Sequence, residues 1–463
     1  MDGGLLVANF TTQSVLFPEL FDRTLVARFD RPHASSDGGA VLLKAADRRL
    51  GLMSALTSCL RDTRDPAKVR HGLDDLFAQR VYGVACGYED ANDAARLAGD
   101  PIHKLLLGRD AITGAALASQ PTLSRFENGV TRGELLRISQ ALFETVLRRL
   151  AQRLRGKVQT ITIDLDVTDD PTHGQQELTF FHGHYGHWCY LPLLAYLTFN
   201  GEPDQHLVAA MLRPGNAATA LGTLTMLKRI VGRLQERFPR ARLLVRLDGG
   251  FAGPALLEFL DEVQVDYVVG LPSNPVLARS AAALLASMRL RSERTGVTEH
   301  VYGECRYAAK TWDRERRVVI KAEVVRHEGR EPRDNPRFVV TNLTRVPQRL
   351  YERVYCMRGE IENRIKELHY GLSFDRTSCC RFLANQLRVL LTAAAYVLMQ
   401  EIRTAAVRTS LARAQVSTLR ERLFKLGAEV TVSVRRILLH LPSTFAFRDE
   451  WCVVAAALGA RAG

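Results

Sequence analysis

The stretch VQTITIDLDVT, Val158–Thr168, decides the fold of this chain. Apolar side chains alternate strictly with polar ones along it, at Ile161, Ile163, Leu165 and Val167. Such alternation is typical of a β-strand that buries one face. The polar face carries Asp164 and Asp166 near its end. The stretch therefore predicts a strand that holds carboxylates.

The segments that follow predict a complete α/β core. Two further strands, residues 190–199 and 207–212, flank a turn at Asn200-Gly201, which is a hairpin signal. Next come a helix over 217–237, the strand RLLVRLD ending at Asp248, a helix over 254–263 and the strand DYVVGLP. The order βββαβαβ predicts a ribonuclease H-like core with helices packed outside the sheet.

The remaining segments define five predicted regions. We expect a mainly helical DNA-binding region at 1–157, the first part of the core at 158–272 and a β-rich insertion at 273–350. Helices at 351–403 return to the core, and 404–463 form a basic C-terminal region. The segment QPTLSRFEN, Gln120–Asn128, has the pattern of a helix start.

Charge and hydropathy indicate the class of partner and the compartment. Lys and Arg number 63 against 50 for Asp and Glu, a formal net charge of +13, which favours a polyanion such as DNA. The longest apolar stretch, Val389–Met399, is shorter than the ~20 residues of a membrane span and predicts a buried helix. The sequence start has no secretory pattern, and the eight cysteines contain no CxxC pair. We expect a cytoplasmic, nucleoid-associated protein with no membrane partner.

Two aspartates are predicted to meet at one edge of the sheet. Asp166 lies near the end of the first core strand, and Asp248 ends the fourth. Ligands of open α/β sheets collect at strand carboxyl ends, and two adjacent buried carboxylates require a cation. Oxygen ligands suit Mg²⁺ or Mn²⁺. Asp164 is the competing first ligand because it points to the same face.

A third carboxylate is expected from the segment YCMRGEIENRIKELHY, which offers Glu360, Glu362 and Glu367. At ~100° per residue, Glu362 shares a face with a largely basic stripe, while the other two point away. This stripe also fits a solvated helix face with i,i+4 ion pairs. The combination with two aspartates favours Glu362 as a ligand, with DNA held by neighbouring side chains of the stripe, Tyr355, Arg358, Lys366 and His369.

The motifs D-x-T at Asp166, LDGGF at Asp248 and Y-x2-R-x3-E ending at Glu362 resemble one family. It is the bacterial insertion-sequence transposases of the DDE class that carry a Tyr-Arg-Glu-Lys signature. The resemblance implies that these three acidic residues bind metal and that Tyr355 and Arg358 contact transposon-end DNA. The signature lysine is expected where this chain has His369, so His369 or Lys366 fills its role.

The resemblance further implies a DNA transposase that cleaves transposon ends and joins them to target DNA by phosphoryl transfer. Two Mg²⁺ ions, with Mn²⁺ as a substitute, would serve both steps. The implied partners are double-stranded DNA, as terminal inverted repeats and target, and a second protomer in a homodimer. The alternatives are a ribonuclease H-fold nuclease and a non-catalytic protein that binds transposon ends; the presence of all three acidic residues argues against the second.

Overall fold

The computed structural model describes residues 15–17 and 19–461. Its centre is a mixed sheet of strand order β12-β13-β15-β11-β10-β4-β8-β9. Strand β4 (Thr160–Val167) pairs antiparallel with β8 on one side and parallel with β10 on the other, and β11 continues the parallel part. The neighbouring strands are β8 Leu193–Phe199, β9 His206–Met211, β10 Arg242–Leu247 and β11 Asp266–Leu271.

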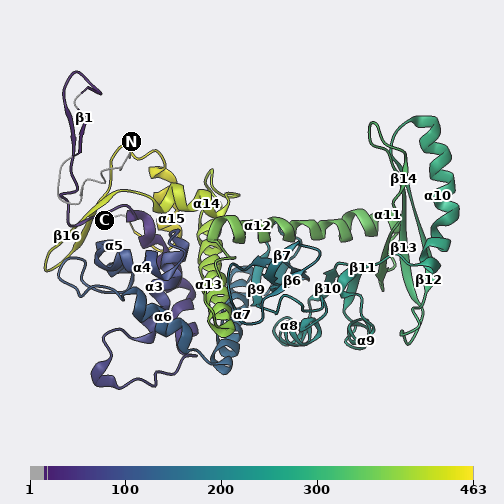
Figure 1. The fold of residues 1–463 in the computed structure, drawn as a ribbon, viewed down its shortest axis with the longest axis horizontal. Helices are drawn as coiled ribbons and strands as arrows, with labels where there is room; N and C mark the ends of the chain where they lie inside the picture. Colours follow the sequence, from purple (N-terminus) through teal and green to yellow (C-terminus); the bar gives the residue numbers. More distant parts are fainter. Residues whose placement is uncertain (1–14, 18, 462–463) are drawn as a thin grey trace, which may run out of the picture.

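The helices α8 (Thr223–Arg237) and α9 (Pro254–Glu262) complete the order β4-β8-β9-α8-β10-α9-β11, which is the order predicted from the sequence. Figure 1 shows both helices on one side of the sheet and α12 (Glu360–Leu372) on the other. A small separate sheet lies between β4 and β8 in the chain, made of β5 Asp170–Pro171, β6 Phe180–His182 and β7 His187–Tyr190.

Residues 273–350, the predicted β-rich insertion, continue the central sheet. Strand β15 pairs antiparallel with β11, placing Thr341 opposite Val268, and β13 pairs with the other edge of β15. In Figure 1 this segment forms the end of the molecule farthest from the N-terminal helices. Its elements are α10 Pro275–Thr295, β12 Glu299–Tyr307, β13 Arg316–Val325, β14 Arg333–Asp334 and β15 Arg337–Thr341.

The N-terminal region is largely helical. Helix α6 begins at Gln120 with Pro121 in its first turn, where a missing N–H is tolerated. Thr131 and Glu134 form a capping box at the start of α7. The elements are β1 Val15–Phe17, β2 Leu25–Ala27, β3 Ala34–Ser35, α1 Val41–Leu50, α2 Leu52–Thr57, α3 Leu73–Ala85, α4 Ala91–Arg96, α5 Pro101–Leu106, α6 Gln120–Gly129 and α7 Arg132–Leu154.

Helix α13 (Phe382–Ala405) is the central helix of the fold. It is long and apolar enough to cross a membrane, but 83% of its most apolar window is buried inside the protein, which is what the sequence predicted for this stretch. It packs against α1, α3, α7 and β9. Its polar residues serve the interior: Arg388 pairs with Glu127 at 2.9 Å, and Asn385 bonds both backbone groups of Cys379.

The C-terminal segment returns to the N-terminal one, because β16 pairs with β3. Several basic residues of the two regions make ion pairs within the fold. Arg149 binds both oxygens of Glu401, and Arg153 binds Glu202. These arginines at the end of α7 are therefore structural. The remaining elements are α11 Pro347–Leu350, α14 Val416–Leu419, β16 Ala428–Val432, β17 Ile437–His440 and α15 Arg448–Ala457.

Candidate active site

The two predicted aspartates lie at the same edge of the sheet. In the parallel pair β4-β10, Asp164 stands opposite Arg246. Two residues further along each strand this register brings Asp166 beside Asp248. Asp248 caps the short helical turn Gly249–Phe251, and its carboxylate accepts a hydrogen bond from the Gly250 amide at 2.9 Å. The parallel register therefore gathers both carboxylates at the strand carboxyl ends.

Asp164 is a structural residue in this arrangement. Its side chain is 0% exposed, and Arg246 donates to both oxygens, at 2.8 and 2.6 Å. Gln205 donates a further hydrogen bond at 3.1 Å. Because these contacts occupy the carboxylate, the geometry favours Asp166 over Asp164 as the group that faces the edge.

Arg358 lies between the two aspartates. Its Nη2 is 3.0 Å from Asp166 Oδ1 and 3.5 Å from Asp248 Oδ2, and its side chain is 12% exposed. Among the residues that the structure describes, its Nε has no hydrogen-bond partner. The guanidinium therefore places a positive charge between the two carboxylates, where a metal ion could also bind. The sequence placed Arg358 on the same face as Glu362 but predicted DNA as its partner.

Glu362 belongs to the same electrostatic site. Burial raises the pKa of Asp166 to about 6; the Arg358 charge lowers this pKa, and the charges of Asp248 and Glu362 raise it again. Glu362 itself is exposed in the first turn of α12. Three carboxylates from distant parts of the chain therefore act on one another.

The surroundings of Glu362 also differ from those of Glu360 and Glu367, the two other glutamates of this segment. Glu367 is buried, where it binds Arg403, accepts a hydrogen bond from Tyr396 at 2.9 Å and accepts another from the Val416 amide at 2.8 Å. Glu360 is exposed, with Asn363 donating to it at 3.4 Å. Glu367 is thus a core residue, as its predicted orientation away from the basic stripe suggested.

The other predicted site residues divide into two groups. Tyr355 packs on Gly270 so tightly that a Cβ there would lie 2.7 Å from its hydroxyl, and burial raises its pKa. His369 Nε2 lies 3.1 Å from the Thr168 hydroxyl, the threonine of the D-x-T motif. Lys366 is exposed on α12. Tyr355 and His369 thus border the cluster, and Lys366 faces solvent.

A divalent cation fits this donor set. The three carboxylates are all-oxygen ligands, which Mg²⁺ and Mn²⁺ prefer. The pKa of Asp166 is raised chiefly by its burial, and the charges of Asp248 and Glu362 add to this, so a bound cation would stabilise the ionised carboxylate. Arg358 already places a positive charge between Asp166 and Asp248, so these two carboxylates stabilise a cation at this position.

A second group of potential metal ligands lies elsewhere, at Asp37, Cys86 and His103, whose ligand atoms lie within 4.8 Å of one another. Lys425 Nζ is already 2.7 Å from Asp37 Oδ1, and His103 Nε2 is 2.9 Å from Oδ2. These contacts lower the pKa of Asp37 against the effect of its burial. We interpret this group as a compensated ion-pair cluster that joins the two terminal segments.

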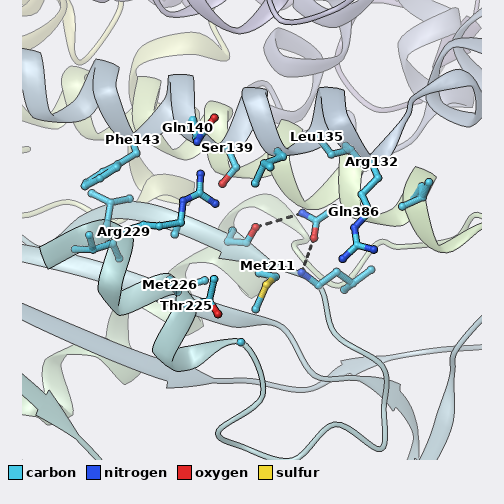
Figure 2. A pocket seen from close by; sticks show the side chains of 18 of the residues that line it. Arg132, Leu135, Ser139, Gln140, Phe143, Met211, Thr225, Met226, Arg229 and Gln386 are labelled. Carbon is cyan, nitrogen blue, oxygen red and sulfur yellow. Dashed lines mark hydrogen bonds between the residues drawn. The ribbon is translucent and has the colours of Figure 1, made fainter. Parts of the chain in front are cut away.

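The fold also contains an apolar pocket of about 650 Å³ between α7, β9 and α8 (Figure 2). Gln386 of α13 closes one side of it: its side chain accepts from the Leu212 amide at 2.7 Å and donates to the Ala210 carbonyl at 3.3 Å. These bonds occupy backbone groups at the outer edge of the sheet and so discourage pairing with another strand. The pocket is lined by none of the three carboxylates.

The sequence matches the family described as transposase DDE domain, group 1, over residues 17–461. The chain belongs to this family. It is therefore a DNA transposase, an enzyme of DNA cleavage and strand transfer, as the sequence motifs predicted. No curated protein matches the chain. Among solved structures, a cryo-EM structure of a piggyBac transposase synaptic complex with hairpin DNA is 10% identical, covering 83% of this chain and 79% of that one, with a TM-score of 0.44.

Sequence reasoning missed one functional neighbour of the transposase site, Arg246, which neutralises Asp164. A signal for it exists in the sequence. Arg246 precedes Asp248 by two residues, as Asp164 precedes Asp166, so parallel pairing of the two strands sets arginine against aspartate. An arginine in the middle of an apolar strand requires a buried partner.

Proposed function

We propose that Asp166, Asp248 and Glu362 are the catalytic residues of the transposase and its metal ligands, with Mg²⁺ as the natural ion and Mn²⁺ as a substitute. The observation that carries the proposal is the arginine cation held between Asp166 and Asp248 beside Glu362. A site that holds one cation between two carboxylates, with a third carboxylate close enough to act on Asp166, has the charge and the oxygen donors for divalent ions.

The chain's own residues position the reaction. When bound, two divalent ions would supply activation of the attacking oxygen and stabilisation of the leaving oxygen. Asp166 and Asp248 are fixed by the sheet, and Glu362 approaches from α12, so the ligands come from rigid elements. Arg358, which contacts both aspartates, would be available to a DNA phosphate once a divalent ion neutralised them, and Tyr355 and His369 would lie beside the same site.

We further propose a ribonuclease H-like description for β4-β8-β9-α8-β10-α9-β11 with α12, and the five-region organisation given above. The DNA partners are the terminal inverted repeats and the target. Because two transposon ends must be joined in one reaction, the working complex contains two protomers.

The test is a cleavage and strand-transfer assay with a plasmid that carries the element's ends. We expect nicked and joined products with Mg²⁺ and with Mn²⁺, and none with EDTA. The variants Asp166→Asn, Asp248→Asn and Glu362→Gln should each lose at least about 10²-fold in rate. Glu360→Gln is the matched control, because Glu360 is exposed on the same helix; this variant should keep wild-type activity.

Full activity in any of the three ligand variants would overturn the assignment of that residue. If Glu360→Gln lost as much activity as Glu362→Gln, the activity would depend on the total charge of α12 and not on Glu362 as a metal ligand. Cleavage without joined products would favour the nuclease over the transposase as the natural activity of the site.

A further inference from the structure

Arg246 is a buried arginine near the end of β10, and all three nitrogens of its guanidinium donate hydrogen bonds. Nε and Nη2 donate to the two oxygens of Asp164 on β4, at 2.8 and 2.6 Å. Nη1 donates to the backbone carbonyl of Val354 at 3.2 Å. The Arg246 side chain is 9% exposed, so these contacts are made away from water. One planar group therefore joins two neighbouring strands to a segment that lies 108 residues further along the chain.

Two of the proposed metal ligands follow closely after this contact on the sheet. Asp164 precedes Asp166 by two residues at the end of β4, and Arg246 itself precedes Asp248 by two residues at the end of β10. Because the two strands are parallel and Asp164 stands opposite Arg246, the side-chain pair reinforces the backbone register where the strands end. A bidentate pair fixes direction as well as distance. It therefore holds the two ligand-bearing strand ends in one relative position.

The third contact reaches the segment that carries Glu362. Val354 belongs to a π-helical turn, Tyr351–Tyr355, which a 3-10 turn connects to α12. Its side chain is 5% exposed and packs in a small apolar cluster that includes Val268 of β11. The turn is therefore bound on two sides, through this side chain to the apolar cluster and through the carbonyl to Arg246. As a result, the helix with Glu362 in its first turn starts from a fixed point.

Charge compensation alone does not account for this arrangement. A buried pair of arginine and carboxylate is often no more stable than well-packed apolar side chains of similar volume. A lysine would also neutralise Asp164, but its ammonium is a point charge on a flexible stem and does not hold a carboxylate and a carbonyl in fixed directions. Arg246 uses its fork on Asp164 and its third nitrogen on Val354. This geometry indicates that the side chain places the three segments relative to one another.

We propose that Arg246 is a positioning residue of the transposase site. It sets the distance from the strand ends that carry Asp166 and Asp248 to the first turn of α12, which carries Glu362. In this role it acts through Asp164 and the backbone, without contacting metal or DNA. The inference rests on the proposed function in that the three carboxylates are the metal ligands. Removing a group that orients metal ligands typically lowers metal affinity roughly 10- to 100-fold, because the ligands are no longer held in the productive geometry.

The test uses a full-length variant in which stability and positioning separate. Asp164→Asn/Arg246→Met removes both buried charges, so it should melt close to wild type in calorimetry. The turn at Val354, however, loses its hydrogen bond to the sheet. Isothermal titration with Mn²⁺ alone, without DNA, should therefore show about tenfold weaker binding. In EDTA, hydrogen exchange should become several-fold faster in peptides that cover 351–362 and stay unchanged in peptides from α13.

Arg316→Met/Asp261→Asn is the matched control. Arg316 is 3% exposed and binds Asp261 at 2.9 Å, so this variant also removes a buried arginine and its aspartate, between β13 and α9. Its Mn²⁺ affinity and its exchange at 351–362 should match wild type.

Unchanged Mn²⁺ affinity or unchanged exchange at 351–362 in the Arg246 double variant would overturn the proposal. Wild-type values of both in Arg246→Lys would also overturn it, because lysine keeps the charge without the fork. If Asp166→Asn binds Mn²⁺ like wild type, the ligand assignment has failed. The exchange measurement needs no metal and then decides the role of Arg246 by itself.

Discussion

The structure assigns opposite roles to Asp164 and Asp166, two residues apart on one strand, and a pair of asparagine variants tests this directly. Asp164 is fully buried and bound by Arg246 through two hydrogen bonds. Asp164→Asn preserves volume but leaves the Arg246 charge buried without a carboxylate, which costs about 3–5 kcal/mol. Asp166→Asn removes a desolvated carboxylate that lies beside other negative charges.

The expected shift in melting temperature follows from chain size. At ~2.1 cal/mol/K per residue, unfolding of 463 residues as one unit has an entropy of about 1 kcal/mol/K, so Asp164→Asn should melt about 3–5 °C lower. Asp166→Asn, without divalent ions, should melt at or above the wild-type temperature. Differential scanning calorimetry in EDTA measures both, and the plasmid assay measures activity.

A double replacement separates pairing from packing. Asp164→Asn combined with Arg246→Met removes the uncompensated charge and should recover much of the loss. The reasoning is refuted if Asp164→Asn melts like wild type yet is inactive while Asp166→Asn remains active, because the roles of the two carboxylates would then be reversed.

Three further predictions concern charges inside the fold. Arg358→Met should bind Mn²⁺ roughly tenfold more tightly than wild type without DNA, because the competing guanidinium is gone; isothermal titration measures this, and unchanged affinity would contradict it. Glu367→Gln should lower the free energy of unfolding by about 3–5 kcal/mol through loss of the buried Arg403 pair, and Glu362→Gln should leave it unchanged; urea unfolding compares them. Burial lowers the pKa of His206 to about 3, so the folded state cannot take the proton that the unfolded state gains below about pH 6.5. Stability should therefore fall as pH decreases from 6.5 toward 3, and His206→Leu should reduce this slope; identical slopes in urea titrations would rule the histidine out.

Local patterns predicted the core because they depend on burial alone. The alternation around Ile163 predicted β4, and the basic stripe that shares a helix face with Glu362 separated this residue from Glu367. The parallel register then brought Asp166 and Asp248 together, which strand order was sufficient to predict.

Contacts between distant segments were not visible in the sequence. Arg149 and Arg153 look like a free basic helix end, but their partners Glu401 and Glu202 lie 252 and 49 residues away. The pairing of β15 with β11 likewise joins the predicted insertion to the sheet through backbone hydrogen bonds, which side-chain periodicity does not encode.

The position of Arg358 depends on local backbone geometry that differs from a regular α-helix. The chain leading into α12 forms a π-helical turn over Tyr351–Tyr355 and a 3-10 turn over Cys356–Gly359. Both depart from 100° per residue and are frequent at functional sites. A regular helical wheel therefore gave the correct face for Arg358 but not its contact with the aspartates.

The central position of α13 has a consequence for folding during synthesis on the ribosome. The N-terminal helices α1, α3 and α7 pack on a helix that ends at Ala405, and β3 pairs with β16. We therefore expect the apolar faces of these early segments to stay exposed to solvent until α13 and β16 have been synthesised. Nascent chains of this kind are prone to aggregation. We expect truncated products to be cleared, so that only completed transposase reaches DNA.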